Sequence, residues 1–224
     1  MSPHHLMSIT VALAGDTMLG RGVAEHLQSV SPESLVAPEV VAALAEADLF
    51  VLNLECCISD RGRPWARPGK PFFFRAPPAA VGLLRALDVD CVTLANNHAL
   101  DFGSEALLDT LALLDEAGIA HVGAGADLER ARCPAVLDAR GLRMAVFGMS
   151  DHPDDFAAAP DRPGIAFDEL RDGVPNWLIE QIEGHRSSGA AVLVTPHWGP
   201  NMTTAPLPRV RSAATELIAA GATL

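Results

Sequence analysis

Four short apolar runs in this chain each end in a cluster of polar residues. The clusters are Gly15-Asp16, Asn53-Leu54-Glu55, Asn96-Asn97-His98 and His197-Trp198-Gly199. Apolar runs of this length are typical of strands buried on both faces, which occur in parallel sheets. Because parallel α/β sheets bind ligands at the carboxyl ends of their strands, the pattern predicts an α/β fold with a polar site at one edge.

Helical and strand-like segments alternate along the rest of the chain. We expect strands over residues 9–14, 49–52, 89–94, 119–122 and 190–195, and helices over residues 38–47, 79–87, 104–116, 174–186 and 209–220. Ser104 is expected to cap the third helix. The remaining segments are a hairpin over 134–138 and 142–149, long loops over 59–78 and 151–163, and the start of a further strand at 222–224.

The composition restricts the classes of protein to which the chain can belong. A length of 224 residues with 49% hydrophobic content suits one domain over residues 1–224. The net charge of -12 argues against a nucleic-acid partner, because binding to phosphates needs clustered positive charge. Residues 1–7 lack the features of a signal peptide and no long apolar run follows, so we expect a cytoplasmic chain. The four cysteines form no CxxC pair and are expected to be reduced and mostly buried.

The polar clusters combine residue types that bind metals and transfer protons. The side-chain oxygen of Asn97 can ligate a hard divalent metal, while the neighbouring His98 can transfer a proton. Asp16, Glu55 and His197 add two carboxylates and an imidazole at the ends of other predicted strands. Convergence of these side chains on one edge predicts a metal site.

Each of these residues also has a structural interpretation. Asp16 can be a helix cap, Glu55 a solvated strand end and His197 a hydrogen-bonded core histidine. Asn96 is expected to be a turn residue, of a type that tolerates left-handed backbone. Arg21 is placed to contact an anionic substrate, with a surface role as the alternative. Arg75 and His152 lie in the long loops, where they either bind substrate or are ordinary loop polarity. It is the combination of the polar clusters that favours a functional site over these structural interpretations.

Taken together, these motifs resemble the CapA family of poly-γ-glutamate capsule biosynthesis proteins, a branch of the calcineurin-like metallophosphoesterases. The resemblance rests on Gly15 to Arg21, Asn53-Leu54-Glu55, Ala95 to Gly103 and His197 to Met202, and runs from the first strand to the last residue. It implies a four-layered α/β sandwich of the metallophosphoesterase type, with a metal centre at the strand ends.

The resemblance also implies a role for each residue of the site. Asp16 matches the first metal ligand, Glu55 the carboxylate that bridges two metals, Asn97 the amide ligand and His197 a later ligand. His98 resembles the general acid that protonates the leaving oxygen, and Asp101 orients its ring. The implied cofactors are divalent ions, of Mn, Zn or Fe, two of them in the complete protein. Such a pair activates a water and stabilises charge on a phosphoryl group.

Two departures from the family pattern bear on activity. Position 18 is Met18, where typical members of the superfamily have a histidine ligand. The family pattern also continues with a Gly-His-x-x-His motif, and this sequence stops at Leu224 before it. We therefore expect this chain to lack the last strands and the last metal motif of the domain, to bind metal weakly, and to self-associate through the sheet edge that this leaves open.

The resemblance implies a function in capsule or poly-γ-glutamate biosynthesis, by hydrolysis or transfer of a phosphorylated or γ-glutamyl intermediate. Its partners would be an anionic polymer or a phosphorylated small molecule. One alternative is a general metal-dependent phosphoesterase with an unrelated substrate. Another is a non-catalytic module that binds polymer, which the two departures favour.

Overall fold

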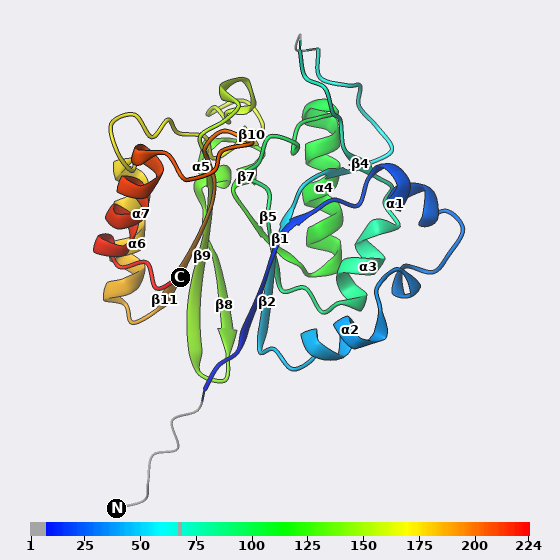
Figure 1. Ribbon diagram of the computed structural model, residues 1–224, viewed down its shortest axis with the longest axis horizontal. Helices are drawn as coiled ribbons and strands as arrows, with labels where there is room; N and C mark the ends of the chain where they lie inside the picture. The colour runs from blue at the N-terminus through cyan, green and yellow to red at the C-terminus, as the bar shows by residue number, and fades with distance from the viewer. Residues whose placement is uncertain (1–7, 67–68) are drawn as a thin grey trace, which may run out of the picture.

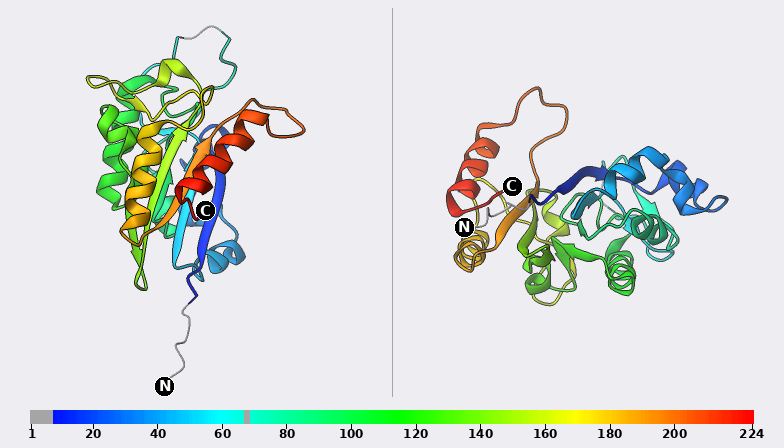
Figure 2. Two further views of the ribbon diagram at one scale, coloured as in Figure 1. Left: turned by 90° about the vertical axis from the view of Figure 1, so that its left-hand side faces the viewer. Right: turned by 90° about the horizontal axis from the view of Figure 1, so that it is seen from below.

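The computed structural model of the chain describes residues 8–66 and 69–224 and has four layers (Figure 1). Two sheets lie face to face, and helices cover the outer face of each one (Figure 2). Residues 1–7, expected not to form a signal peptide, and residues 67–68 of the predicted long loop lie outside the described residues. The four-layered α/β arrangement that the family resemblance implies is confirmed.

The first sheet is parallel and holds three of the four polar clusters. Its strand order is β1-β2-β5-β6. The strands are β1 (Val11–Thr17), β2 (Leu49–Leu54), β5 (Cys91–Thr93) and β6 (Ala120–Val122). The connecting helices are α1 (Arg21–His26), η1 (Pro32–Leu35), α2 (Pro38–Leu44), α3 (Ala80–Ala86) and α4 (Gly103–Ala117).

The second sheet has the order β11-β9-β8 and supplies the fourth cluster. Its strands are β8 (Ala135–Ala139), β9 (Leu142–Ser150) and β11 (Ala191–His197), covered by α6 (Asn176–Ser187) and α7 (Pro208–Ala220). The pair β8 and β9 is the predicted hairpin, and β11 runs parallel to β9. The shorter elements are β3 (Cys57–Ile58), β4 (Arg75–Ala76), β7 (Ala124–Gly125), α5 (Leu128–Arg132), η2 (Asp154–Phe156) and β10 (Gly164–Ile165).

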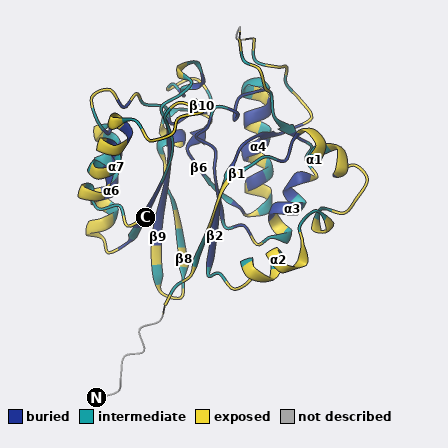
Figure 3. Cartoon of the chain, in the orientation of Figure 1, coloured by how far each residue is buried: buried dark blue, intermediate teal, exposed yellow. Residues whose placement is uncertain are grey.

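Three apolar clusters hold the layers together, and the central strands carry much of the buried surface (Figure 3). One lies between the first sheet and α3 and α4 and includes Leu52 and Leu107. A second lies between the two sheets and includes Val51 and Val146, and the third joins the second sheet to α6 and α7. The strands β2, β5 and β9 are thus buried on both faces, as their continuous apolar runs predicted, whereas β1 is largely exposed.

The sheets approach each other closely beside the polar clusters, and two glycines permit this. A Cβ atom on Gly148 of β9 would lie 3.0 Å from the Cα atom of Gly123. Gly123 itself has φ +81°, and a Cβ there would lie 2.6 Å from the Cβ of Ala95. The absence of side chains at both positions brings the turn after β5 next to the second sheet.

Several local expectations differ from the structure. Asp16 and Asn53 lie inside β1 and β2, because both strands extend further than their apolar runs. Helix α4 begins at Gly103 with Phe102 at its N-cap position, so the predicted cap at Ser104 is wrong. Asn96 lies at the bend that opens the turn after β5, as expected, and its φ is not positive.

The cysteines are free, as expected. Cys56, Cys57 and Cys91 are buried, and burial raises the pKa of each of these thiols to about 12, which makes them poor nucleophiles. Cys133 is exposed. Within the described residues, no helix combines the length and the apolar character that crossing a membrane requires.

Candidate metal centre

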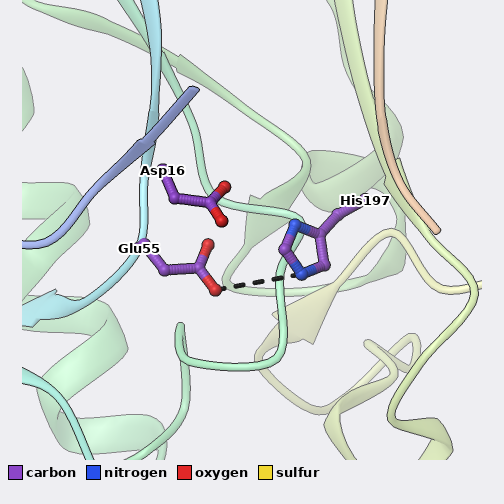
Figure 4. Close-up of side chains that lie close together, drawn as sticks. All are labelled: Asp16, Glu55 and His197. Carbon is purple, nitrogen blue, oxygen red and sulfur yellow. Dashed lines mark ion pairs between the residues drawn. The ribbon is translucent and has the colours of Figure 1, made fainter. Parts of the chain in front are cut away.

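The four predicted ligands meet where the carboxyl ends of the two sheets face each other. Single ligand atoms of Asp16, Glu55 and His197 all lie within 4.8 Å of one another, and their side chains point to a common centre (Figure 4). The amide oxygen of Asn97 lies 2.8 Å from Nε2 of His197. The structure thus brings together side chains from β1, the end of β2, the turn after β5 and β11.

A bulge in β1 directs Asp16 toward Glu55. The pairing register with β2 shifts between Ala14 and Asp16, so that Asp16 lies opposite Asn53. The Nδ2 group of Asn53 donates to Oδ1 of Asp16 at 2.9 Å and also to Oε2 of Glu55. One amide therefore holds the two carboxylates side by side.

The exposed carboxylate of Asp16 repels the buried carboxylate of Glu55. Glu55 is 6% exposed, and burial together with the negative charge of Asp16 raises its pKa to about 7. A divalent cation between the carboxylates would offset both the cost of burying the Glu55 charge and its repulsion by Asp16. The carboxyl group thus has the properties expected of a metal ligand.

The imidazole of His197 is kept neutral by its surroundings. Burial, followed by the nearby His152, lowers its pKa to about 4. Its Nε2 atom lies 3.8 Å from Oε1 of Glu55. A neutral imidazole is the form that ligates metals, so this group is also prepared for coordination.

Asn96 organises the turn that carries Asn97 and His98. Its fully buried side chain donates to the Asn53 side chain at 3.0 Å and to the Leu54 carbonyl at 2.9 Å, and its Oδ1 accepts from the His98 backbone N–H at 3.0 Å. Neither Asn53 nor Asn96 was assigned a role in the site from the sequence. The available signal was that polar side chains within or beside a buried strand need partners.

His98 and Asp101 form a pair at the side of the centre. Nδ1 of His98 lies 2.6 Å from Oδ2 of Asp101, and Nε2 lies 3.9 Å from Oε1 of Glu55. The imidazole also stacks on the Phe74 ring, with 4.0 Å between ring centroids. The arrangement directs Nε2 toward the carboxylates and fixes the ring from its other side, which is suitable for proton transfer.

The three residues predicted to bind substrate lie in different surroundings. The Arg21 guanidinium lies over the rings of Phe72 and Phe74 at 5.6 and 6.0 Å, and its backbone has φ +53°, which is costly for arginine. The His152 ring lies 5.3 Å from that of His197. His152 therefore borders the centre, whereas Arg21 lies beside Phe74, whose ring stacks on His98.

Arg75 is oriented differently. Its guanidinium lies 4.2 Å from the centre of the Phe102 ring and donates to the Arg61 carbonyl at 3.1 Å. Those contacts do not connect it to the four ligands. Met18 is also directed elsewhere, since its sulfur accepts a hydrogen bond from the Gly20 N–H at 3.0 Å.

Two pockets open next to the centre. One has a volume of about 370 Å³ and is lined by residues that include Lys70, Asn97, His152 and Asp155. The other, of about 420 Å³, lies between β1 and β11 and contains both Asp16 and His197 in its wall. Ligands can therefore approach the centre from two sides.

The donor set fits a divalent transition metal. Carboxylate and amide oxygens suit hard ions such as Mn²⁺, and imidazole suits Zn²⁺ and iron. Asp16, Glu55, Asn97 and His197 would hold the metal, and the opposed pKa shifts of Glu55 and His197 fit this assignment.

The sequence profile of one protein family, described as "Bacterial capsule synthesis protein PGA_cap", matches residues 10–224. The chain belongs to this family. Its resemblance to CapA proteins is thereby confirmed. The PGA_cap match includes the strands, the bulge and the turn that carry the centre described above.

This chain spans only part of the length of the curated relatives that it matches. A "Probable polyglutamine synthesis accessory protein" of Mycobacterium tuberculosis is 34% identical over 95% of this chain and 66% of the relative. The "Capsule biosynthesis protein CapA" of Bacillus anthracis is 26% identical over 96% of this chain and 52% of the relative. Among solved structures, the NAD nucleotidase of Haemophilus influenzae matches with a TM-score of 0.49 and 12% identity, over 91% of this chain and 40% of that chain.

Proposed function

We propose that this chain carries the metal centre of a protein for biosynthesis of a capsule or of poly-γ-glutamate, and that the centre hydrolyses or transfers a phosphorylated or γ-glutamyl intermediate. The observation that carries the proposal is the convergence of Asp16, Glu55, Asn97 and His197. The family and the names of its longer relatives support the biological role.

The chain's own residues supply the remaining parts of such a reaction. Asp16, Glu55, Asn97 and His197 would hold the divalent metal, which would supply an activated water and stabilisation of charge on a phosphoryl group. His98, whose Nε2 faces the centre, would deliver a proton to the leaving oxygen. Arg21 would contact an anionic substrate, and its strained backbone next to the first ligand strand supports a functional role. His152 would contact the same substrate from its place next to His197.

Removal of single ligands tests the metal centre. We expect Asn97→Ala and Glu55→Ala to abolish binding of Mn²⁺ or Zn²⁺ measured by calorimetry, because no neighbouring donor replaces either oxygen. Asn201→Ala removes an exposed amide from a turn after β11 and serves as the matched control. Wild-type affinity in Asn97→Ala or Glu55→Ala would disprove the assignment of ligands.

Turnover of substrate analogues tests the reaction. Hydrolysis of aryl phosphates by the metal-loaded chain, and its loss in His98→Gln, is the result expected of the phosphoesterase centre. Rapid turnover of many unrelated phosphoesters would favour a general phosphoesterase instead.

One observation favours a second function. Met18 occupies the position of a family ligand, and its sulfur is directed to the Gly20 N–H. A chain that lacks one imidazole could bind an anionic polymer without reacting with it. Binding of poly-γ-glutamate with no turnover, at full metal occupancy, would support this alternative.

A further inference from the structure

Lys70 is the single lysine in a chain that otherwise uses arginine as its basic residue. It lies in the loop between β3 and β4, yet its side chain is only 12% exposed. Its Nζ atom donates to the Asn97 carbonyl at 2.6 Å and lies 2.8 Å from Oδ1 of Asp101. A lysine is seldom buried unless it is paired, so the burial of Lys70 indicates that its ammonium has specific partners in the fold.

The acceptor of this ion pair is the carboxylate that holds His98. Asp101 is fully buried, and its Oδ2 atom accepts from the His98 imidazole and from the Phe74 backbone N–H, each at 2.6 Å. Within the described part of the chain, Oδ1 accepts no hydrogen bond of good geometry, so the ammonium of Lys70 is what balances it. Lys70 thus contacts one oxygen of the Asp101 carboxylate, and His98 binds the other.

The second contact of Lys70 is with the backbone carbonyl of Asn97, the predicted amide ligand. The Asn97 carbonyl belongs to the residue whose side chain points at His197. A compact ammonium with three donors can bind this carbonyl and the carboxylate together, whereas a planar guanidinium is larger and has fixed directions. The rings of Phe156 and Phe73, 5.2 and 5.9 Å away, lie around the charge.

We propose that Lys70 is a positioning residue, which fixes Asp101 and the Asn97 turn so that Nδ1 of His98 stays bound to Asp101 and Nε2 faces the centre. The inference rests on the proposed function of the His98–Asp101 pair. An ionised carboxylate only accepts hydrogen bonds, so the imidazole hydrogen lies on Nδ1 in this arrangement.

A direct role of Lys70 in binding an anionic substrate fits the structure less well. Its ammonium already contacts two acceptors of the chain. Four acidic residues also lie in the wall of the pocket that Lys70 borders, namely Asp151, Asp154, Asp155 and Glu169.

The decisive variant is Lys70→Met, with Arg63→Met as the control that removes an exposed cation from the same loop. In a histidine-labelled, metal-free sample, the Nδ1-bound proton of His98 is assigned through its loss in His98→Gln. We expect Lys70→Met to abolish this signal through solvent exchange, and Arg63→Met to retain it. An unchanged His98 signal in Lys70→Met would overturn the proposal.

Kinetics separate positioning from substrate binding. With an aryl phosphate, Lys70→Met should lower kcat about 10- to 100-fold, the usual effect of losing a residue that holds a catalytic group, and leave KM within about twofold. A raised KM with normal kcat would assign Lys70 to the substrate and overturn the proposal. If the wild-type chain turns over no phosphoester, the proposed function fails, and the His98 spectrum still decides the role of Lys70.

The wild-type chain provides a test that needs no variant. Because there is one lysine, a sample labelled with ¹⁵N-lysine contains one side-chain ammonium. We expect its protons to exchange slowly enough to be observed, with cross-relaxation to the His98–Asp101 turn. An ammonium in fast exchange with solvent would contradict the buried contact on which the proposal depends.

Discussion

Glu55 and His197 make opposite contributions to stability when no metal is bound. Glu55 has a pKa near 7 in the folded chain against an ordinary value of 4.5, so folded chains hold its proton more tightly and rising pH destabilises them between these values. His197 has a pKa near 4 against 6.5, so unfolded chains bind its proton more tightly and rising pH stabilises the fold in that range. The two effects offset each other over most of their range.

Glu55→Gln should remove the contribution of Glu55 to the pH dependence of stability and leave that of His197. A pKa difference of this size corresponds to about 3 kcal/mol, so the free energy of unfolding of Glu55→Gln, minus that of wild type, should rise by up to about 3 kcal/mol between pH 4.5 and 7. Urea unfolding in the presence of EDTA measures this difference. His197→Gln is the matched control, because its difference from wild type should fall between pH 4 and 6.5. Differences that do not change with pH would show that the two groups are not perturbed.

The ligand positions could be predicted from the sequence, but the side chains that hold them together could not. Asp16, Glu55, Asn97 and His197 stand where apolar runs end, and parallel strands end at one edge. Asn53 and Asn96 act across strands, and their role depends on pairing register and on the bulge in β1. The direction of the Arg75 side chain depends on Phe102, which lies in a different turn. Such contacts leave little signal in a local pattern.

At the scale of elements, the position of the Asn96–His98 turn depends on how closely the sheets approach. Gly123 follows β6 with φ +81°, and its backbone lies against Ala95, directly before the turn. Gly148 of β9 faces Gly123 from the second sheet. The two glycines set the spacing between the sheet that supplies Asn97 and the sheet that supplies His197.

Gly123→Ala should therefore damage both the fold and the centre. A left-handed backbone costs alanine about 1 kcal/mol, and the added methyl would enter space occupied by Ala95, which costs roughly 1–3 kcal/mol more. Gly118→Ala is the matched control, since Gly118 has φ +72° and its Cβ would meet no atom within 4 Å. Urea unfolding should show a loss of about 1 kcal/mol for Gly118→Ala and a larger one for Gly123→Ala. Only Gly123→Ala should also weaken binding of Mn²⁺, and equal losses in the two variants would refute the close approach.

The order of the large elements could be predicted, because long apolar runs and helical periodicity are strong signals. The hairpin of β8 and β9 and the end of α4 at Gly118 are confirmed. The short helix α5 was not predicted, since a segment of five residues contains less than two helical turns. The predicted strands end too early where polar site residues continue the observed strand, as at Asp16 and Asn53.

At the scale of the whole molecule, the two sheets present their edges on the same side. The C-terminus lies beside β1 in both views of Figure 2, and the pocket between β1 and β11 is lined by apolar residues that include Leu13 and Leu224. Thr223 and Leu224 already form backbone hydrogen bonds with Val192 and Val194 of β11, as a further strand would. In this 224-residue chain, β1 has a largely exposed surface, and Leu13 is 54% exposed.

We expect the 224-residue chain to self-associate through this side, because an open apolar sheet edge pairs readily with another chain. Sedimentation velocity over a range of concentrations should show an average mass rising above 23.6 kDa. Leu13→Glu places a charge at the edge and should keep the chain monomeric. Ile218→Glu, at a residue of α7 that is 69% exposed and does not line the pocket, should associate as wild type does. A wild-type chain that stays at 23.6 kDa, or an Ile218→Glu variant that dissociates as fully as Leu13→Glu, would show that this edge does not mediate association.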